Sequence, residues 1–322
     1  MAAVERLGQP GWCRNLVGAA RIEPGERVLI VVDEPLVEEG SQLLAAVKDA
    51  GAEPRLELWA GKHPLARAPV PVREGVRESS ACIFLAQRPR GDEARARFDV
   101  QEGLLEHGGR GLFLGFIDPP LLQGELSEPA VDLEVPARRL LDELDRSSTI
   151  RIRGEAGTDL TLDVTGRRWL ADSLPLESGG FVNYPNGEVY IAPLRHGADG
   201  VLVADLTISY TSDGLVDAPV TLRFERGRVT SIEGGRSAQK LRELVADAGR
   251  GADVIGEFGI GFNPTVKPRG HIMLDEKAAG TAHVAIGRNT GSYGGDNEAG
   301  IHVDCVFSAP QVEADGRPIP LP

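Results

Sequence analysis

Two side chains near the C-terminal end of the chain, His302 and Asp304, have the residue types and the spacing of a metal-binding pair. They lie in the strand-like segment 300–307, and alternate residues of a strand point to the same face. An imidazole and a carboxylate on one face can bind one ion together. This pair suits zinc, cobalt, manganese or ferrous iron better than calcium or magnesium alone.

Three more candidate ligands occupy apolar or small-residue surroundings in the same half of the chain. Glu188 follows a Pro-Asn-Gly turn at the head of an apolar strand, Glu257 lies in a glycine-rich segment, and His283 has small and apolar flanks. An unpaired charge would be strongly unfavourable in such surroundings. Each of these residues alone could be an ordinary solvated side chain. The metal hypothesis therefore rests on the occurrence of all the candidate ligands in one half of the chain. The candidate ligands would suffice for one ion or for two ions that share a bridging carboxylate.

The second half of the chain, which must position these side chains, is predicted to be α+β and rich in antiparallel strands. Residues 149–153 and 159–164 alternate apolar and polar side chains around a Gly-Glu-Ala-Gly turn, which predicts a hairpin. Further strands are expected at 201–209, 220–224 and 228–232, and a helix at 237–248.

The first half is predicted to be α/β. Residues 26–33 form a continuous apolar run, typical of a strand buried on both faces. Segment 41–50 has helical spacing and ends at Gly51, a favourable position for a helix to stop. Strands with short connections to helices imply a mainly parallel sheet. The other expected elements are strands at 55–59, 80–85 and 111–117 and a helix at 94–107.

Length and the change of pattern predict two domains. The 322 residues exceed the usual size of a single domain. A helix expected at 136–144 ends the first of them. We therefore place an α/β domain at residues 1–145 and a C-terminal catalytic, metal-binding domain at residues 146–322.

The composition indicates a soluble, cytoplasmic protein. Lys and Arg number 35 against 48 Asp and Glu, a net charge of −13. This balance disfavours nucleic acid and an anionic membrane surface as partners, because both rely on basic patches. The three cysteines form no CxxC pair, which fits a reducing cytosol. No apolar run precedes the first strand, so we expect no signal peptide, and no apolar run approaches the roughly 20 residues that span a bilayer.

Other common chemistries find no support in the sequence. No GxGxxG opens a helix after the first strand, and neither a Walker-type GxxxxGK[ST] nor a GxSxG nucleophile elbow occurs. The remaining histidines are weaker ligand candidates. His63, His107 and His196 have loop or charged flanks, and we expect them to face solvent.

Several stretches of the second half, in a fixed order within residues 149–308, carry a family resemblance. They are Gly157-Thr-Asp-Leu-Thr161, Pro185-Asn-Gly-Glu-Val-Tyr-Ile-Ala-Pro193, Gly256-Glu-Phe-Gly-Ile-Gly-Phe-Asn-Pro264, Asp275-Glu-Lys with Gly280-Thr-Ala-His-Val-Ala-Ile-Gly287, and His302-Val-Asp304. In these stretches the chain resembles the thermophilic aminopeptidase T family, metallopeptidases with a dinuclear site.

The resemblance implies a homodimeric hydrolase that removes N-terminal residues from peptides, or cleaves a related amide, by a metal-activated water. It implies two divalent ions, zinc, cobalt or manganese, and a small peptide or other small molecule as substrate. Glu188 or Glu257 would double as the bridging ligand in catalysis. The implied metal ligands are Glu188, Glu257, His283, His302 and Asp304, with Glu276 as a sixth candidate.

One position departs from the family. The active-site tyrosine, seven residues after the histidine, falls here on Thr290. Tyr293, from the glycine-rich loop 289–295, would take its place and assist proton transfer.

A second function stays open at this point. The same fold family resembles the ring-opening dihydroxypyridine dioxygenases, in which two histidines and one aspartate bind a single ferrous ion. His283, His302 and Asp304 would form such a triad, with open positions for oxygen and substrate. The carboxylate pair Glu188 and Glu257 favours two metals, whereas Thr290 weighs against a peptidase.

Overall fold

A computed structural model describes residues 9–87, 93–128, 131–173, 180–211 and 214–322. The chain falls into two units by its internal contacts. The first unit contains Met1–Asp132 and Leu174–Pro185, and the second contains Leu133–Ser173 and Asn186–Pro322. The first unit therefore also includes a short segment from the middle of the chain.

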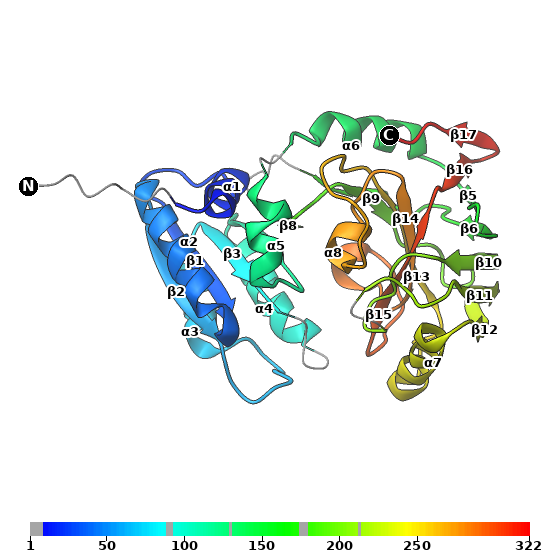
Figure 1. Cartoon of the computed structure of the whole chain (residues 1–322), viewed down its shortest axis with the longest axis horizontal. Helices are drawn as coiled ribbons and strands as arrows, with labels where there is room; N and C mark the ends of the chain where they lie inside the picture. Colours follow the sequence, from blue (N-terminus) through cyan, green and yellow to red (C-terminus); the bar gives the residue numbers. More distant parts are fainter. Residues whose placement is uncertain (1–8, 88–92, 129–130, 174–179, 212–213) are drawn as a thin grey trace, which may run out of the picture. The chain divides into compact units, whose positions relative to one another are not determined.

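Five parallel strands form the sheet of the first unit, in the order β2-β1-β3-β4-β8 (Figure 1). The apolar run of β1 is buried along its length after Arg27, as expected for a parallel strand covered on both faces. The strands are β1 (Arg27–Asp33), β2 (Glu53–Trp59), β3 (Ala81–Leu85), β4 (Arg110–Leu114) and β8 (Phe181–Asn183). The helices are α1 (Gly11–Ala19), η1 (Glu34–Leu36), α2 (Val37–Asp49), α3 (Val70–Glu78), α4 (Ala94–Leu105), α5 (Pro119–Gln123) and η2 (Glu125–Ser127).

Aromatic side chains contribute to the core of this unit. The ring of Phe84 lies 4.8 Å from that of Trp59 and 5.3 Å from that of Phe113, centroid to centroid. Such tilted and edge-on pairs pack favourably in a core. The prediction of an α/β domain with a mainly parallel sheet is confirmed.

The second unit contains two antiparallel sheets. The larger, sheet B, has the order β12-β11-β10-β6-β5-β16-β17, and its hairpin of β5 and β6 is the predicted one. Residues of β6 alternate between exposed and buried, so sheet B has one solvated face. Its strands are β5 (Thr149–Arg153), β6 (Asp159–Asp163), β10 (Ala198–Ala204), β11 (Val220–Glu225), β12 (Arg228–Glu233), β16 (Gln311–Ala314) and β17 (Arg317–Ile319).

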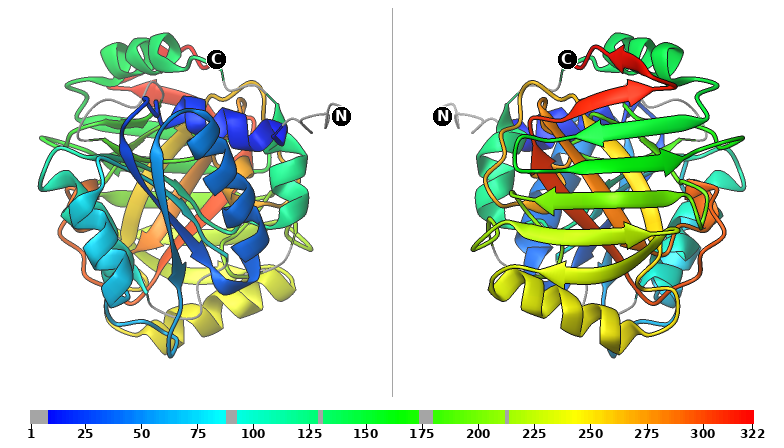
Figure 2. Two further views of the ribbon diagram at one scale, coloured as in Figure 1. Left: turned by 90° about the vertical axis from the view of Figure 1, so that its left-hand side faces the viewer. Right: turned by 90° about the vertical axis from the view of Figure 1, so that its right-hand side faces the viewer.

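The smaller sheet of the second unit, sheet C, has the order β15-β14-β13-β9-β7. Figure 2 shows sheet B stacked on sheet C, with the strands of the two sheets crossing steeply. Every residue of β13 and β14 is buried, so both faces of these strands are covered. The strands are β7 (Leu170–Asp172), β9 (Glu188–Ile191), β13 (Ile255–Gly261), β14 (Thr281–Gly287) and β15 (His302–Ser308).

Helix α6 (Glu134–Leu144) is the main difference from the expected domain division. The sequence placed it at the end of a first domain of residues 1–145, whereas it packs against β7 and β9 of the second unit. The short strand β8 was not expected in the first unit, but it pairs with β4 there. The remaining helices of the second unit are α7 (Arg236–Ala248), α8 (Ile272–Asp275) and η3 (Gly291–Tyr293).

Candidate metal centre

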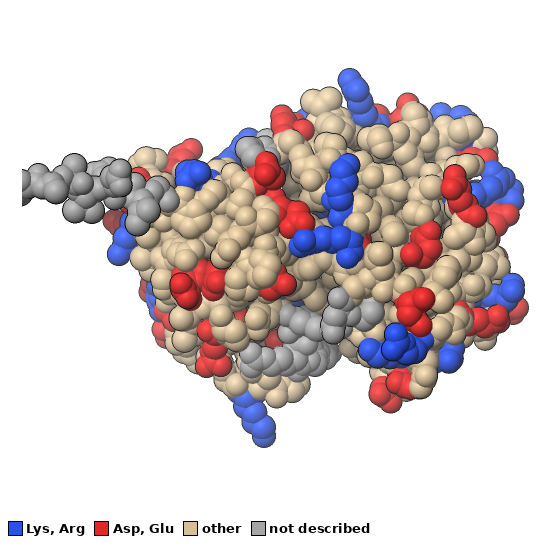
Figure 3. Space-filling model, viewed as in Figure 1, with Lys and Arg blue, Asp and Glu red and all other residues tan. Residues whose placement is uncertain are grey.

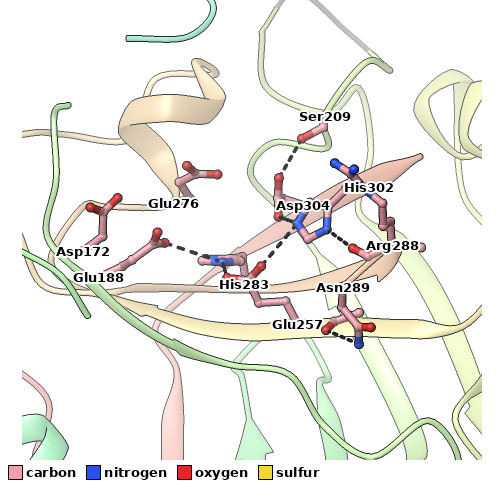
Figure 4. A network of polar contacts seen from close by, with 12 residues as sticks. Asp172, Glu188, Ser209, Glu257, Glu276, His283, Arg288, Asn289, His302 and Asp304 are labelled. Carbon is pink, nitrogen blue, oxygen red and sulfur yellow. Dashed lines mark hydrogen bonds and ion pairs between the residues drawn. The ribbon is translucent and has the colours of Figure 1, made fainter. Parts of the chain in front are cut away.

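Alternation along the strands of sheet C gathers the candidate ligands on one of its faces. Phe258 and Val284 are paired across β13 and β14, and with Val303 they belong to the fully buried apolar core. Residues one position away along each strand point to the opposite face. That face carries Glu188 on β9, Glu257 on β13, His283 on β14, and His302 and Asp304 on β15. Figure 4 shows these side chains pointing toward one another.

Glycine at position 259 makes room for the imidazole of His283. The two residues are paired between β13 and β14. A Cβ atom added at Gly259 would lie 2.1 Å from Cε1 of His283 and 2.4 Å from its Nε2. A glycine at position 259 of β13 is therefore required by the neighbouring ring.

A first group of ligand atoms consists of Glu188, Glu257 and His283, all buried. His283 Nε2 lies 3.4 Å from Glu257 Oε1 and 3.7 Å from Glu188 Oε2. One donor atom of each residue lies within 4.8 Å of the others, close enough for one ion to bind all three.

A second group consists of Glu257, His302 and Asp304. His302 Nε2 lies 3.3 Å from Glu257 Oε2 and 3.1 Å from Asp304 Oδ1. Glu257 thus belongs to both groups, and its two oxygens face different histidines. A carboxylate placed in this way is arranged to bridge two ions.

One ligand atom of the first group supports metal binding because it is buried and lacks a hydrogen-bond partner among the described residues. This atom is Glu188 Oε2. A buried carboxylate oxygen without a partner is costly, and a bound cation would satisfy it. The donors of both groups, imidazoles and carboxylates, fit zinc, cobalt or manganese.

Hydrogen bonds around the second group fix its orientation. His302 Nδ1 donates to the carbonyl oxygen of Arg288 at 2.7 Å, so Nε2 is left to face the carboxylates. Ser209 Oγ donates to Asp304 Oδ2 at 3.2 Å. Partners of this kind orient metal ligands and select the histidine tautomer.

The ammonium group of Lys277 is the feature of this centre that the sequence did not identify. The residue is 1% exposed, and its Nζ donates to Glu188 Oε1 at 2.5 Å and to Glu276 Oε1 at 2.8 Å. Asp172 Oδ2 lies 4.0 Å away. Lys277 therefore occupies one oxygen of Glu188, while the other oxygen faces His283. The position of Lys277 next to Glu276 in a run of small residues was the available signal, whereas Asp172 had none.

The carboxylates make this centre favourable for positive charge. Burial lowers the pKa of His283, but its hydrogen bond to Glu257 and the charge of Glu188 outweigh burial and raise it to about 9. The pKa of His302 is raised well above its usual range, since Asp304 and Glu257 outweigh the same effect of burial. Burial raises the pKa of Glu276 to about 7, assisted by the charges of Asp304 and Glu188 and opposed by Lys277.

Two further predicted site residues lie beside the ligands. Glu276 is buried and is held by Lys277, and in the described part of the chain it joins neither ligand group. The ring of Tyr293 lies 5.0 Å from that of His302 and 5.7 Å from that of Tyr190. Burial and the charges of Glu257 and Asp304 raise the pKa of Tyr293 well above its usual range, which keeps the phenol protonated.

The triad expected for a ferrous dioxygenase does not form a group of its own. Among the described residues, the ligand atoms of His283, His302 and Asp304 are not all within 4.8 Å of one another. Glu257 lies between the two histidines instead.

The expectation that His63 faces solvent is wrong. Its side chain is 10% exposed and contacts Glu93 through Nδ1. Glu93 also accepts hydrogen bonds from Trp59 Nε1 and the backbone of Leu65, so the pair belongs to a buried polar cluster of the first unit. His107 and His196 are exposed, as expected.

The distribution of charge on the surface is relevant to the expectation that neither nucleic acid nor a membrane is a partner. On the face shown in Figure 3, lysine and arginine side chains stand singly or in small groups between acidic ones. Within the described ranges, no helix is long and apolar enough to cross a bilayer.

Comparison with known proteins relates the second unit to a peptidase family. Residues 136–320 match the thermophilic metalloprotease (M29) family. Aminopeptidase T from Thermus aquaticus is 30% identical over 181 residues, and Aminopeptidase AmpS from Bacillus subtilis (strain 168) is 29% identical over 182 residues. Each match covers 50% of this chain and 43% of the relative. The matched region thus spans less than half the length of these relatives.

Two solved structures share the fold over nearly the whole chain. The 2,5-dihydroxypyridine dioxygenase from Pseudomonas putida KT2440 is 19% identical with a TM-score of 0.75, and covers 96% of this chain and 94% of its own. Wild-type AmpT from Thermus thermophilus is 18% identical with a TM-score of 0.63, and covers 96% of both chains. At these identities the likeness shows the fold alone, and a fold hosts more than one chemistry.

The contact at Gly259 predicts the effect of adding one methyl group. Gly259→Ala should push the ring of His283 away and weaken zinc binding to the first ligand group by about tenfold or more, because one displaced ligand costs at least that much. Isothermal titration of the metal-free protein measures it. Gly300→Ala is the control, since the nearest atom to its added Cβ would lie 4.0 Å away. Wild-type affinity in Gly259→Ala would contradict this account.

The buried ammonium predicts a loss of stability. Lys277→Met should lower the free energy of unfolding of the metal-free protein by about 3–5 kcal/mol, because it leaves buried carboxylates uncompensated. Urea unfolding measures this, with exposed Lys240→Met on α7 as the control. Adding Glu276→Gln to Lys277→Met should recover part of the loss; strictly additive effects would show that the two side chains do not interact.

Proposed function

The chain belongs to the thermophilic metalloprotease (M29) family, and we propose that it is a hydrolase of the metallo-aminopeptidase type. In this proposal it removes N-terminal residues from peptides or cleaves a related amide. The observation that carries the proposal is the position of Glu257, whose two oxygens face His283 and His302 separately. This arrangement suits a pair of ions, and a pair of ions suits hydrolysis.

The ligands divide between two divalent ions, zinc, cobalt or manganese. Glu188 and His283 would hold the first, His302 and Asp304 the second, and Glu257 would bridge them. When bound, such ions lower the pKa of a water molecule and polarise the carbonyl group that it attacks.

The protein's own groups would then position the substrate and move protons. Glu276 is a buried carboxylate that accepts a hydrogen bond from Lys277 and interacts electrostatically with Glu188 and Asp304, so we assign to it the transfer of the attacking water's proton to the leaving amine. The protonated phenol of Tyr293, beside His302, would donate a hydrogen bond to the negative charge that develops on the carbonyl oxygen. Thr290, at the position of the family's tyrosine, would then have no such role.

The resemblance further suggests a homodimer that acts on small peptides, and the sparse cysteines suggest a cytoplasmic location; we retain these as parts of the proposal. Sedimentation velocity of the purified protein tests the homodimer, since a single monomeric species at micromolar concentration would overturn it.

The division of the ligands predicts a pattern of metal loss. Metal-free protein titrated with zinc or cobalt should bind about two ions per chain. His283→Ala and His302→Ala should each lose one ion, whereas Glu257→Gln should weaken both because it serves both groups. Isothermal titration and elemental analysis measure the stoichiometry. Two tightly bound ions in Glu257→Gln would exclude the bridging role.

The proposed role of Tyr293 predicts a loss of rate without a loss of metal. Tyr293→Phe should lower kcat for aminoacyl-p-nitroanilide hydrolysis by about 100-fold, the usual contribution of a positioned hydrogen-bond donor or acid. Metal content should stay at the wild-type value. An active wild type with unchanged kcat in Tyr293→Phe would remove the tyrosine from the mechanism.

Metal analysis, oxygen consumption and aminoacyl-p-nitroanilide hydrolysis together distinguish the two candidate functions. One iron per chain, with oxygen consumption on 2,5-dihydroxypyridine and no hydrolysis of any aminoacyl-p-nitroanilide, would overturn the proposal in favour of the dioxygenase reaction.

A further inference from the structure

The loop that carries Tyr293 joins two strands that hold metal ligands, β14 with His283 and β15 with His302. Its two ends are fastened by asparagine side chains. Asn289 Nδ2 donates to the carbonyl oxygen of Gly256 at 3.0 Å. Asn297 Nδ2 donates to the carbonyl oxygens of Gly251 and Gly287, at 2.8 and 2.7 Å. The base of the loop is therefore fixed to the strands beside the ligands.

The stretch between these fastened ends is held from within by backbone hydrogen bonds, from Gly294 N to the carbonyl oxygen of Gly291 and from Gly295 N to that of Asn289. Gly291 and Gly294 flank the short turn that contains Tyr293, with φ of 73° and 74°. Glycine adopts such backbone conformations without strain, but it leaves the chain free to adopt others. The ring of Tyr293 packs against those of Tyr190 and His302, and the backbone beside it needs a contact from outside the loop as well.

Arg167 provides such a contact. Its Nη1 donates to the carbonyl oxygen of Gly294 at 2.9 Å, and its Nη2 lies 3.4 Å from Asp296 Oδ2. The side chain is 17% exposed, so water competes only in part for these bonds. A guanidinium group can hold a carbonyl oxygen and a carboxylate at once, in a fixed geometry that an ammonium group cannot reproduce.

The segment that carries Arg167 is itself well fixed. Its neighbour Trp169 is buried, packs edge-on against Phe258 at 6.1 Å between ring centroids, and donates to Ser147 Oγ at 3.4 Å. The strand that follows, β7, pairs with β9, which carries Glu188 and Tyr190. Arg167 therefore ties the middle of the loop to the same sheet that holds the ligands.

We propose that Arg167 is a positioning residue that holds the loop of residues 291–296 so that the ring of Tyr293 stays against His302. The inference rests on the proposed function for its effect on rate, because it assigns to Arg167 an action through Tyr293. Its structural part, the fixing of the loop, stands on the contacts alone.

The experiment compares Arg167→Met, which keeps the length of the aliphatic chain but has no donor, with Arg167→Lys. The control is Arg168→Met, an exposed arginine at the next position. Hydrogen exchange of amides 290–297 is measured on the zinc-loaded protein, together with zinc stoichiometry, kcat and KM. Arg167→Met should raise exchange in this stretch by about tenfold, as expected for the loss of charge-assisted hydrogen bonds.

The kinetic readout distinguishes positioning from general destabilisation. In Arg167→Met, kcat should fall by about 10- to 100-fold through misplacement of Tyr293, with little change in KM and with two zinc ions still bound. Arg167→Lys should recover part of both effects, and Arg168→Met should match the wild type. Tyr293→Phe combined with Arg167→Met should be no slower than Tyr293→Phe alone.

The outcomes that overturn the inference are distinct from those that overturn the proposed function. Unchanged exchange at 290–297 in Arg167→Met, exchange raised equally in β14 and β15, or unchanged kcat in an active enzyme would each overturn the role of Arg167. A wild type that hydrolyses no aminoacyl-p-nitroanilide would overturn the proposed function and the rate effect, whereas the exchange measurement would still decide whether Arg167 fixes the loop.

Discussion

The burial of several carboxylates on one face of sheet C is the constraint on which the rest of the second unit depends. Glu188, Glu257 and Glu276 are each less than a tenth exposed. Ionised carboxylates are tolerated in such surroundings only when positive charge or hydrogen-bond donors face them. Lys277 and the two histidines supply part of that compensation. Gly259 and the loop anchor Asn289 lie directly beside the strands that bring these groups together.

A second constraint on sheet C is the space available for side chains, and glycine provides that space. A face that carries imidazole and carboxylate groups on adjacent strands has little room for other side chains, and Gly259 opposite His283 illustrates this. On the other face, Phe258 and Val284 are fully buried in the apolar core. The strands can therefore hold a polar centre without losing the burial of apolar area that stabilises the unit.

The correct predictions from the sequence rest on patterns of residues that are close together in the chain. The two-residue spacing of His302 and Asp304 placed both on one face, and the apolar run of β1 indicated a parallel strand. What failed depends on contacts distant in the chain. The pairing of β8 with β4, the burial of His63 against Glu93 and the meeting of Lys277 with Glu188 have no local signature. The family resemblance supplied the order of the ligands, which spacing alone left open.

Charge balance bears on the choice between two ions and one. Five carboxylates surround the centre, and Lys277 offsets one of their charges (Figure 4). Glu276, whose pKa is raised to about 7, can carry a proton, and the other four carboxylates with Lys277 then leave a net charge of −3. Two divalent ions and one hydroxide would offset this charge while both histidines stay neutral, which is the state in which imidazole binds metal. A single divalent ion would leave one negative charge, and a proton on one of the two histidines would be needed to offset it. Protonated histidines cannot ligate iron, so a triad that requires both of them is at odds with the remaining carboxylates. The shared fold is compatible with either chemistry, and the carboxylates of this chain favour the dinuclear one. The carboxylates at issue are Asp172, Glu188, Glu257, Glu276 and Asp304.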